Sequence, residues 1–257
     1  MDVNLKDKAA VITGSARGIG LKIAEAFGRA GAKVAICDLR ESDVAKTLDG
    51  LKSEGIRTYG EAVDVSKRSS IFSFADNVEE RFGGIDIWVS NAAIFLPYKI
   101  IDTPEDDWQR TMDVNIKSVY YGALIAADKI RKRGGGVLIN AASFASLMPS
   151  LGSGAYAASK AAVYSITKSL AAELAPFNIR VIGYIPGVIE TEMTASTIKS
   201  KRELLESQIA MKRVGDSEEV ANAVLFMASD KASYITGTFI EISGGKLCVQ
   251  NPKDAWS

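Results

Sequence analysis

The sequence contains no histidine, and this absence limits the chemistry that the chain can perform. Histidine is the side chain that titrates nearest to neutral pH, and it is the commonest metal ligand in proteins. Any proton transfer must therefore use tyrosine, lysine, aspartate, glutamate or cysteine, and we expect no metal site.

Cysteine is scarce and long apolar runs are missing. Cys37 and Cys248 do not make a disulfide framework, and we expect both to be reduced, as in a cytoplasmic protein. No segment has the roughly 18 apolar residues that a membrane span needs, and residues 1–8 are charged and lack a signal-peptide core. We therefore expect a cytoplasmic protein that makes no use of a membrane.

An excess of charge of either sign is also absent, because 31 Lys and Arg residues balance 31 Asp and Glu residues. A net charge of zero implies no general attraction to nucleic acid or to membrane surfaces. The 47% hydrophobic and 24% charged residues are typical of a globular protein with a substantial core, which argues against disorder. We expect small molecules as the partners.

Short apolar runs alternate with longer amphipathic stretches along the whole chain. Apolar strands separated by helices are typical of a parallel sheet that is covered on both faces. Strands are expected at residues 9–13, 33–37, 59–65, 85–90, 137–142, 179–185 and about 238–242. The sequence therefore predicts an α/β protein: a single doubly wound Rossmann-type domain over residues 1–257, with a seven-stranded parallel sheet and helices on both faces.

Residues 190–213 form an insertion rich in Thr, Ser and Lys after the sixth expected strand. Open α/β sheets bind ligands at the carboxyl ends of their strands, so we interpret this segment as a substrate lid. An ordinary surface excursion is the alternative. Lys199, Lys201 and Arg202 in this segment would suit an anionic substrate, although such a charge run is more often a solvated face.

A glycine-rich turn follows the first expected strand and opens the first helix, with the sequence Thr13-Gly14-Ser15-Ala16-Arg17-Gly18-Ile19-Gly20. Glycines permit a tight turn, and the backbone N–H groups and dipole at a helix N-terminus favour a pyrophosphate. The turn therefore predicts a dinucleotide site.

Asp38 indicates which dinucleotide is bound. It ends the second expected strand, where its carboxylate can accept hydrogen bonds from both adenosine ribose hydroxyls and repels a 2′-phosphate. Arg17 and Arg40 argue the other way, because a guanidinium binds phosphate well. We expect NAD(H), with NADP(H) as the alternative.

Two Tyr-x3-Lys pairs occur on one expected helix: Tyr156 with Lys160, and Tyr164 with Lys168. Eight residues separate the pairs, which is about 80° around a helix and about 12 Å along its axis, so both cannot face one nicotinamide. Ser143, which lies 13 residues before Tyr156 and just past an apolar strand, favours the first pair. We interpret the second pair as structural.

A tyrosine beside a lysine suits the oxidation of an alcohol. Tyrosine has an ordinary pKa of about 10, which makes it a weak base at neutral pH. Lys160 projects from the same helix face as Tyr156, and its ammonium, together with the charge of an oxidised nicotinamide, favours the phenolate. Ser143 would donate a hydrogen bond to the substrate oxygen, as an oxyanion-hole donor does.

In order and spacing, Asn115, Ser143, Tyr156 and Lys160 resemble the Asn-Ser-Tyr-Lys tetrad of the short-chain dehydrogenase/reductase family. The Gly-x3-Gly-x-Gly spacing and the motif at residues 234–237 carry the resemblance over nearly the whole chain. It implies that Asn115, on the long helix before Ser143, holds a water that connects Lys160 to solvent.

The resemblance also assigns contacts along the dinucleotide. Asp64 and Val65, at the end of the third expected strand, would contact the adenine, with a helix cap as the alternative interpretation of Asp64. Asn91 and Ala92 would lie beside a ribose, and residues 186–191 would flank the nicotinamide carboxamide. The expected cofactor contacts are Gly14, Arg17, Gly18, Ile19, Gly20, Asp38, Asp64, Val65, Asn91, Ala92, Tyr156, Lys160, Pro186, Gly187, Val188, Ile189 and Thr191.

Three places depart from the family pattern. Ala93 stands where the family usually has glycine, and Ser243 replaces an aspartate before two glycines. Residues 182–184, which end with Tyr184, replace the small polar residues that the family usually has before the Pro-Gly turn. Tyr184 would either narrow the pocket or serve packing.

The resemblance implies a homotetramer in which the helices of Asn115 and Tyr156 form one interface and the last strand forms another. Residues 247–257 would either reach a neighbouring subunit's pocket or fray. Apolar side chains expected at the pocket mouth suit a small secondary alcohol or ketone with apolar parts. These side chains are Phe95, Leu96, Tyr98, Phe144, Leu151, Val188 and Met193.

Three functions fit the sequence. The leading one is an NAD(H)-dependent dehydrogenase of a polyol, sugar or other small secondary alcohol, with Tyr156 as general acid and base. The second is an NADPH-dependent 3-oxoacyl-carrier-protein reductase. Its acidic carrier would dock on a basic patch made of Lys129, Arg131, Lys132 and Arg133. The third is a non-catalytic NAD(H)-sensing protein, which the retention of all four tetrad residues disfavours.

Overall fold

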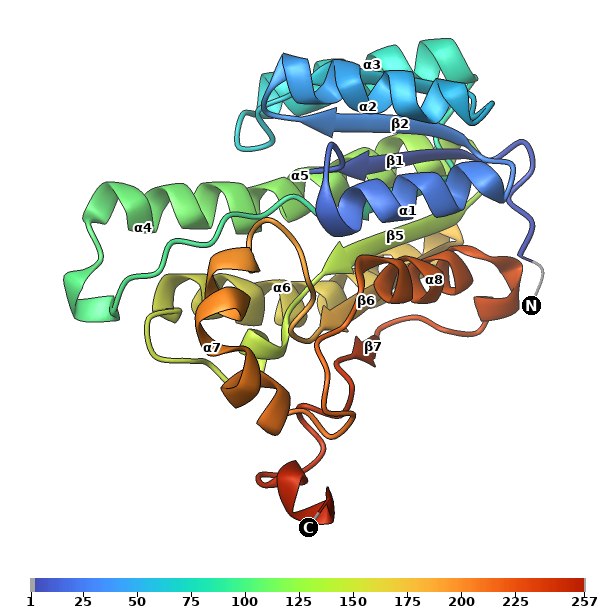
Figure 1. Cartoon of the computed structure of the whole chain (residues 1–257). Helices are drawn as coiled ribbons and strands as arrows, with labels where there is room; N and C mark the ends of the chain where they lie inside the picture. The colour runs from blue at the N-terminus through green and yellow to red at the C-terminus, as the bar shows by residue number, and fades with distance from the viewer. Residues whose placement is uncertain (1–2, 257) are drawn as a thin grey trace.

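The computed structural model describes residues 3–256, in which one seven-stranded parallel sheet forms the centre of the molecule (Figure 1). The strands are β1 (Ala9–Thr13), β2 (Lys33–Asp38), β3 (Thr58–Ala62), β4 (Ile87–Ser90), β5 (Gly136–Ala141), β6 (Ile179–Pro186) and β7 (Phe239–Ile242). Their order in the sheet is β3-β2-β1-β4-β5-β6-β7, which reverses between β1 and β4. The predicted doubly wound Rossmann-type fold is therefore confirmed.

Helices cover both faces of the sheet. They are α1 (Gly18–Arg29), α2 (Glu41–Ser53), α3 (Arg68–Phe82), α4 (Glu105–Met112), α5 (Ser118–Ile125), α6 (Gly154–Leu174), α7 (Ala195–Ser207) and α8 (Ser217–Ala228). Apolar residues of α1, α2 and α8 pack on one face, and those of α3, α5 and α6 pack on the other. Because both faces are buried, strands such as β1 read as continuous apolar runs.

Two helices lie beyond the carboxyl ends of the strands, at the left of Figure 1. One is α4, which continues into α5 through a π-helical stretch at Asp113–Lys117. The other is α7, which occupies the 190–213 segment and bends at the non-helical Lys201. Stretches of π-helix occur often at functional sites, and this one contains Asn115.

Two strand boundaries differ from the expectation by more than one residue. β3 ends at Ala62, so Asp64 and Val65 lie in the turn before α3 and not at a strand end. Val63 and Val65 are buried, which extends the apolar pattern past the last paired residue of the strand. β4 begins at Ile87, two residues later than expected. None of the helices in residues 3–256 has the length and apolar character that a bilayer span requires.

Candidate functional site

A cleft of about 920 Å³ runs along the carboxyl ends of the strands. Its walls come from the glycine-rich turn, the ends of β2 and β4, the first turns of α6, and the segment that follows β6. This is the edge of the sheet where the strand order reverses, and where doubly wound sheets bind their ligands.

The glycine-rich turn leaves no room for a Cβ atom at Gly14 or Gly20. Gly14 and Gly18 adopt φ values of +62° and +56°, which favour glycine. A Cβ on Gly14 would lie 2.7 Å from Ala92 Cα, and a Cβ on Gly20 would lie 2.2 Å from Gly14 O. Within residues 3–256, no side chain caps the N-terminus of α1, and its first turn has no acidic residue. Its N–H groups therefore remain able to bind an anion.

Asn91 holds this turn from the neighbouring strand. Its Nδ2 donates hydrogen bonds to Thr13 O at 3.0 Å and to Gly14 O at 2.9 Å. Its Oδ1 accepts a hydrogen bond of 2.8 Å from the hydroxyl of Tyr184, which is fully buried. Burial raises the pKa of Tyr184, so the phenol stays a neutral donor. Tyr184 therefore supports Asn91 in addition to lining the cleft.

Asp38 is the last residue of β2 and lines the cleft. Its carboxylate accepts hydrogen bonds from the backbone N–H groups of Ala16, at 3.2 Å, and Leu39, at 2.8 Å. These two bonds aim the carboxylate at the glycine-rich turn.

The two arginines near Asp38 are each paired with a carboxylate. Arg17 Nη1 lies 2.9 Å from Glu192 Oε2, and Arg40 Nη2 lies 2.6 Å from Asp43 Oδ2. Both guanidinium groups that would favour a 2′-phosphate therefore already have an acidic partner.

Asp64 makes a local turn at the start of α3. Its Oδ1 accepts hydrogen bonds from Ser66 N at 3.0 Å and from Ser66 Oγ at 2.6 Å. Asp64 and Val65 nevertheless line the cleft, so the adenine contact stays a prediction.

Ser143, Tyr156 and Lys160 come together where β5 ends and α6 begins. The hydroxyl oxygen of Ser143 accepts a hydrogen bond of 3.1 Å from Ala145 N, which leaves its O–H free to donate. Lys160 is 2% exposed, and its Nζ donates to Ala141 O at 2.8 Å. The same Nζ lies 5.8 Å from the centroid of the Tyr156 ring.

The pKa values of this group are set mainly by burial. Burial lowers the pKa of Lys160 to about 8. Burial also raises the pKa of Tyr156, and a hydrogen bond with Ser143 opposes this rise. The protein alone therefore favours the neutral phenol. The phenolate was expected from Lys160 together with the charge of an oxidised nicotinamide, and this expectation stays a prediction.

Asn115 is fully buried in the π-helical stretch, and its amide is bonded to the protein. Its Nδ2 donates to Ile94 O and to Ser159 Oγ, both at 3.0 Å, and its Oδ1 accepts from Ile94 N at 2.8 Å. Ser159 Oγ in turn donates to Tyr156 O at 2.7 Å. Asn115 thus connects residue 94 to the first turn of α6, and the water relay stays a prediction.

The second Tyr–Lys pair lies elsewhere on α6. Tyr164 stacks on Phe239 of β7, with ring centroids 4.2 Å apart and an interplanar angle of 15°. Lys168 Nζ lies 4.6 Å from the Tyr164 ring centroid. The Tyr164 ring therefore packs α6 against β7. This placement agrees with the expectation that the second pair is structural and that both pairs cannot face one nicotinamide.

The side chains expected at the pocket mouth divide into three groups. Phe95, Leu96 and Met193 line the cleft, and the Phe95 ring meets the Tyr156 ring edge-on at 5.4 Å. Phe144 and Val188 belong to an apolar cluster under α7. Tyr98 and Leu151 are exposed.

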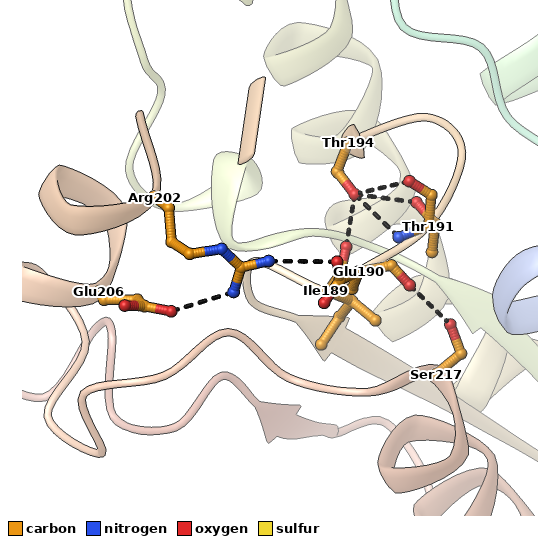
Figure 2. A network of polar contacts seen from close by, with 7 residues as sticks. All are labelled: Ile189, Glu190, Thr191, Thr194, Arg202, Glu206 and Ser217. Atoms are coloured by element: carbon orange, nitrogen blue, oxygen red, sulfur yellow. Dashed lines mark hydrogen bonds and ion pairs between the residues drawn. The ribbon is translucent and has the colours of Figure 1, made fainter. Parts of the chain in front are cut away.

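The 190–213 segment is tied to the turn after β6 (Figure 2). Thr194 Oγ1 donates to Ile189 O at 2.6 Å and lies 3.1 Å from the hydroxyl of Thr191. Arg202 pairs with both Glu190 and Glu206 at 3.2 Å. These ion pairs argue against Arg202 as the receptor of an anionic substrate and favour the alternative of a solvated charged face.

The expected basic patch is neutralised in the same way. Lys129 is buried and lies 2.6 Å from both Asp76 and Glu79. Lys132 pairs with Asp128 at 2.9 Å, Arg133 with Asp86 at 3.3 Å, and Arg131 covers the Phe177 ring at 4.1 Å. These contacts argue against a docking surface for an acidic carrier.

The end of the chain packs on its own subunit. Residues 252–256 form a short 3-10 helix, and Trp256 Nε1 donates to Ala210 O at 3.0 Å. Residue 257 lies outside the described residues.

Two polar residues beside the site were not found by sequence reasoning. Ser159 joins Asn115 to Tyr156, and only its position one turn after Tyr156 and next to Lys160 indicated a role. Lys246 is 6% exposed, and a charged residue after a Gly-Gly pair was the available signal.

Comparison with known proteins gives consistent results. A family model described as Enoyl-(Acyl carrier protein) reductase matches residues 14–246. The chain is 39% identical to an uncharacterized oxidoreductase of Thermotoga maritima, over 96% of this chain and 100% of that protein. It is 38% identical to an NAD-dependent glycerol dehydrogenase of Listeria innocua, over 95% of each.

A solved structure has the same fold. The crystal structure of a short-chain type dehydrogenase/reductase from Mycobacterium marinum superposes with a TM-score of 0.92 at 35% identity. The match covers 96% of this chain and 98% of that chain.

Proposed function

Because the chain belongs to the short-chain dehydrogenase/reductase family of NAD(P)(H)-dependent oxidoreductases, we propose that it interconverts a small secondary alcohol and its ketone with NAD(H). The observation that carries this proposal is the meeting of Ser143, Tyr156 and Lys160 at one end of a cleft whose other end is the glycine-rich turn. Retention of this arrangement argues against a protein that only senses the dinucleotide.

The cleft fits a dinucleotide. The glycine-rich turn packs tightly against residues 91–92, and the uncapped N-terminus of α1 lines the cleft, where its N–H groups would bind a pyrophosphate. A bound nicotinamide dinucleotide supplies two-electron chemistry as a hydride acceptor or donor. Residues 186–191 would hold the nicotinamide end, and Asp64 with Val65 would hold the adenine end.

Tyr156 is the proton-transfer group in this proposal. In reduction, its neutral phenol gives a proton to the carbonyl oxygen of the ketone, which suits the raised pKa of the protein alone. In oxidation, it takes the hydroxyl proton of the alcohol, and the charge of Lys160 stabilises the resulting phenolate. In the protein alone the Ser143 hydroxyl bonds Tyr156, and with a substrate present its O–H would donate to the substrate oxygen and stabilise its negative charge.

Several contacts support NAD(H) over NADP(H). The carboxylate of Asp38 stands where it would accept the ribose hydroxyls, and it would repel a 2′-phosphate. Arg17 and Arg40 are held by Glu192 and Asp43. The glycerol dehydrogenase relative is NAD-dependent by its name.

The substrate end of the cleft supports a small alcohol with an apolar part, because Phe95, Leu96 and Met193 line it. The carrier-protein reductase is the weaker candidate, since the basic patch is neutralised by acids of the same chain. We also propose a homotetramer, with the helices of Asn115 and Tyr156 in one interface and β7 in another. Light scattering after gel filtration measures that state.

Replacing Tyr156 with Phe tests the proposal, with Tyr164→Phe as the matched control. Both variants lose one phenolic oxygen from α6, but Tyr164 packs on Phe239 away from the cleft. NADH absorbance, followed with a panel of polyols and ketones, should show a loss of about 100- to 10,000-fold for Tyr156→Phe. Tyr164→Phe should keep the wild-type rate. Equal turnover by the two variants would contradict the assignment.

A further inference from the structure

Lys246 is a buried cation without an acidic partner. It is 6% exposed, its Nζ donates to Gln208 Oε1 at 3.1 Å, and this atom lies 5.3 Å from the centroid of the Phe144 ring. Lys246 forms no ion pair with any residue of the described chain, 3–256. An ammonium has three donors, and a buried charge normally has a partner of opposite charge. Desolvation accordingly lowers the pKa of Lys246.

The backbone turns sharply just before Lys246. Gly244 and Gly245 adopt φ values of +63° and +83°. A Cβ on Gly244 would lie 2.9 Å from Ile209 Cγ2, and a Cβ on Gly245 would lie 2.8 Å from Ala210 Cβ. The two glycines therefore let the chain press against residues 209–210, with the Lys246 side chain directed inward onto Phe144 and Gln208.

Three segments meet around the ammonium. Phe144 directly follows Ser143, and Gln208 directly follows α7. The loop of Lys246 packs against the turn after β6, since Gly187 N donates to Ile242 O at 2.9 Å and a Cβ on Gly187 would lie 2.6 Å from Ser243 Cα. The ammonium therefore faces the ring of the residue that follows Ser143.

Two arginines of this region are already balanced by acids. Arg202 bonds Glu190 and Glu206 (Figure 2), and Arg213 lies 2.6 Å from Glu219. Lys246 differs from them because it is buried and its hydrogen-bond partner is a neutral amide. Gln208 accepts from Lys246 through Oε1, which presents the two N–H donors of its Nε2 beside the ammonium.

We propose that Lys246 and Gln208 bind a carboxylate at the end of the substrate remote from the carbinol carbon. This rests on the proposed function, and it makes the substrate a hydroxy acid in oxidation and an oxo acid in reduction. One ammonium and one amide match the single charge of a carboxylate better than the double charge of a phosphate monoester. Phe144, whose ring centroid lies 5.3 Å from the ammonium, directly follows Ser143, the proposed donor to the reacting oxygen.

The test compares straight-chain oxo acids of increasing length with their methyl esters, using wild type, Lys246→Met and Lys246→Arg. Lys52→Met, which removes an exposed lysine of α2 outside the cleft lining, is the matched control. Wild type should prefer at least one acid over its ester by about 10- to 100-fold in kcat/KM, the range of a charged hydrogen bond. Lys246→Met should abolish this preference with little change for the esters, Lys246→Arg should keep part of it, and Lys52→Met should keep it all.

Two further measurements do not depend on turnover. Lys246→Met should raise the Tm of the free protein, because it removes a buried charge without a partner, whereas a purely structural lysine would lower the Tm when lost. Quenching of NADH fluorescence in Tyr156→Phe should report binding of the acids, and adding Lys246→Met to this variant should abolish that binding.

The outcomes separate the two proposals. Acids that bind through Lys246 without any turnover by wild type would support the carboxylate site and count against the dehydrogenase. Turnover of ketones and esters with an acid-to-ester ratio that Lys246→Met leaves unchanged would overturn the carboxylate site and leave the dehydrogenase intact. A lower Tm for Lys246→Met together with unchanged acid binding would likewise overturn the carboxylate site.

Discussion

Tyr184→Phe removes one buried hydroxyl and leaves the ring that packs in the core. The lost group is the donor to Asn91 Oδ1 at 2.8 Å, and Tyr184 is fully buried. An acceptor that loses its partner in the interior costs about 1–3 kcal/mol of folding free energy. In a chain of this length each kcal/mol corresponds to about 2–4 °C, so we expect the Tm to fall by about 2–12 °C.

The same variant should weaken dinucleotide binding. The hydroxyl of Tyr184 fixes the orientation of the Asn91 amide, whose Nδ2 holds Thr13 O and Gly14 O. Without that hydroxyl the amide is free to rotate and the glycine-rich turn loses part of its support. A loss of about 0.7–1.4 kcal/mol would raise the Kd for NADH about 3- to 10-fold. Fluorescence titration with NADH measures this Kd, and thermal melting with and without NADH measures the coupling.

Tyr164→Phe is the control, because it makes the same chemical change at a ring that stacks on Phe239. We expect it to shift stability by less than about 0.5 kcal/mol and to leave NADH binding unchanged. If Tyr184→Phe matched this control in both Tm and Kd, the support of Asn91 by Tyr184 would be refuted.

Two further predictions follow from the charged groups of the cleft. Glu192→Gln frees Arg17 from its 2.9 Å ion pair and should raise kcat/KM for NADP(H) several-fold with little change for NAD(H); an unchanged cofactor ratio would show that the pair does not influence selection. Burial lowers the folded pKa of Lys160 to about 8, so the unfolded chain holds more protons above that pH and the free energy of unfolding should rise with pH. Between about pH 7.5 and 9.5, below the titration of Tyr156, this rise should be about 2 kcal/mol larger in wild type than in Lys160→Met, as urea unfolding at the two pH values would show.

Much of the fold could be predicted because burial on both faces leaves a strong pattern. The first strand was placed at residues 9–13, where β1 lies, since all five of its residues are buried. The third strand was placed too far along the chain, because Val63 and Val65 are buried without pairing in the sheet. The apolar pattern of a sequence indicates which residues are buried. Where a strand stops pairing depends instead on the length of the neighbouring strand in the sheet.

The candidate site could be predicted where a residue's place follows from the end of a strand. Asp38 and Ser143 belong to this class, and so do the glycines after β1. The partners of these groups could not be predicted, because they come from distant parts of the chain. Asn91 meets Tyr184, and Arg17 meets Glu192, only through the packing of β4 and β6 around one cleft.

Two buried lysines contact residues 141–144, and the sequence did not predict these contacts. Lys160 donates to the carbonyl of Ala141, and Lys246 lies over the ring of Phe144, so residues 141–144 separate the two charges. Each pKa is lowered by burial, and neither lysine forms an ion pair within residues 3–256. Uncompensated burial of two cations opposes folding, and a negative charge can relieve it on each side. In the proposed reaction the phenolate of Tyr156 would do so at Lys160, and the carboxylate of a substrate would do so at Lys246.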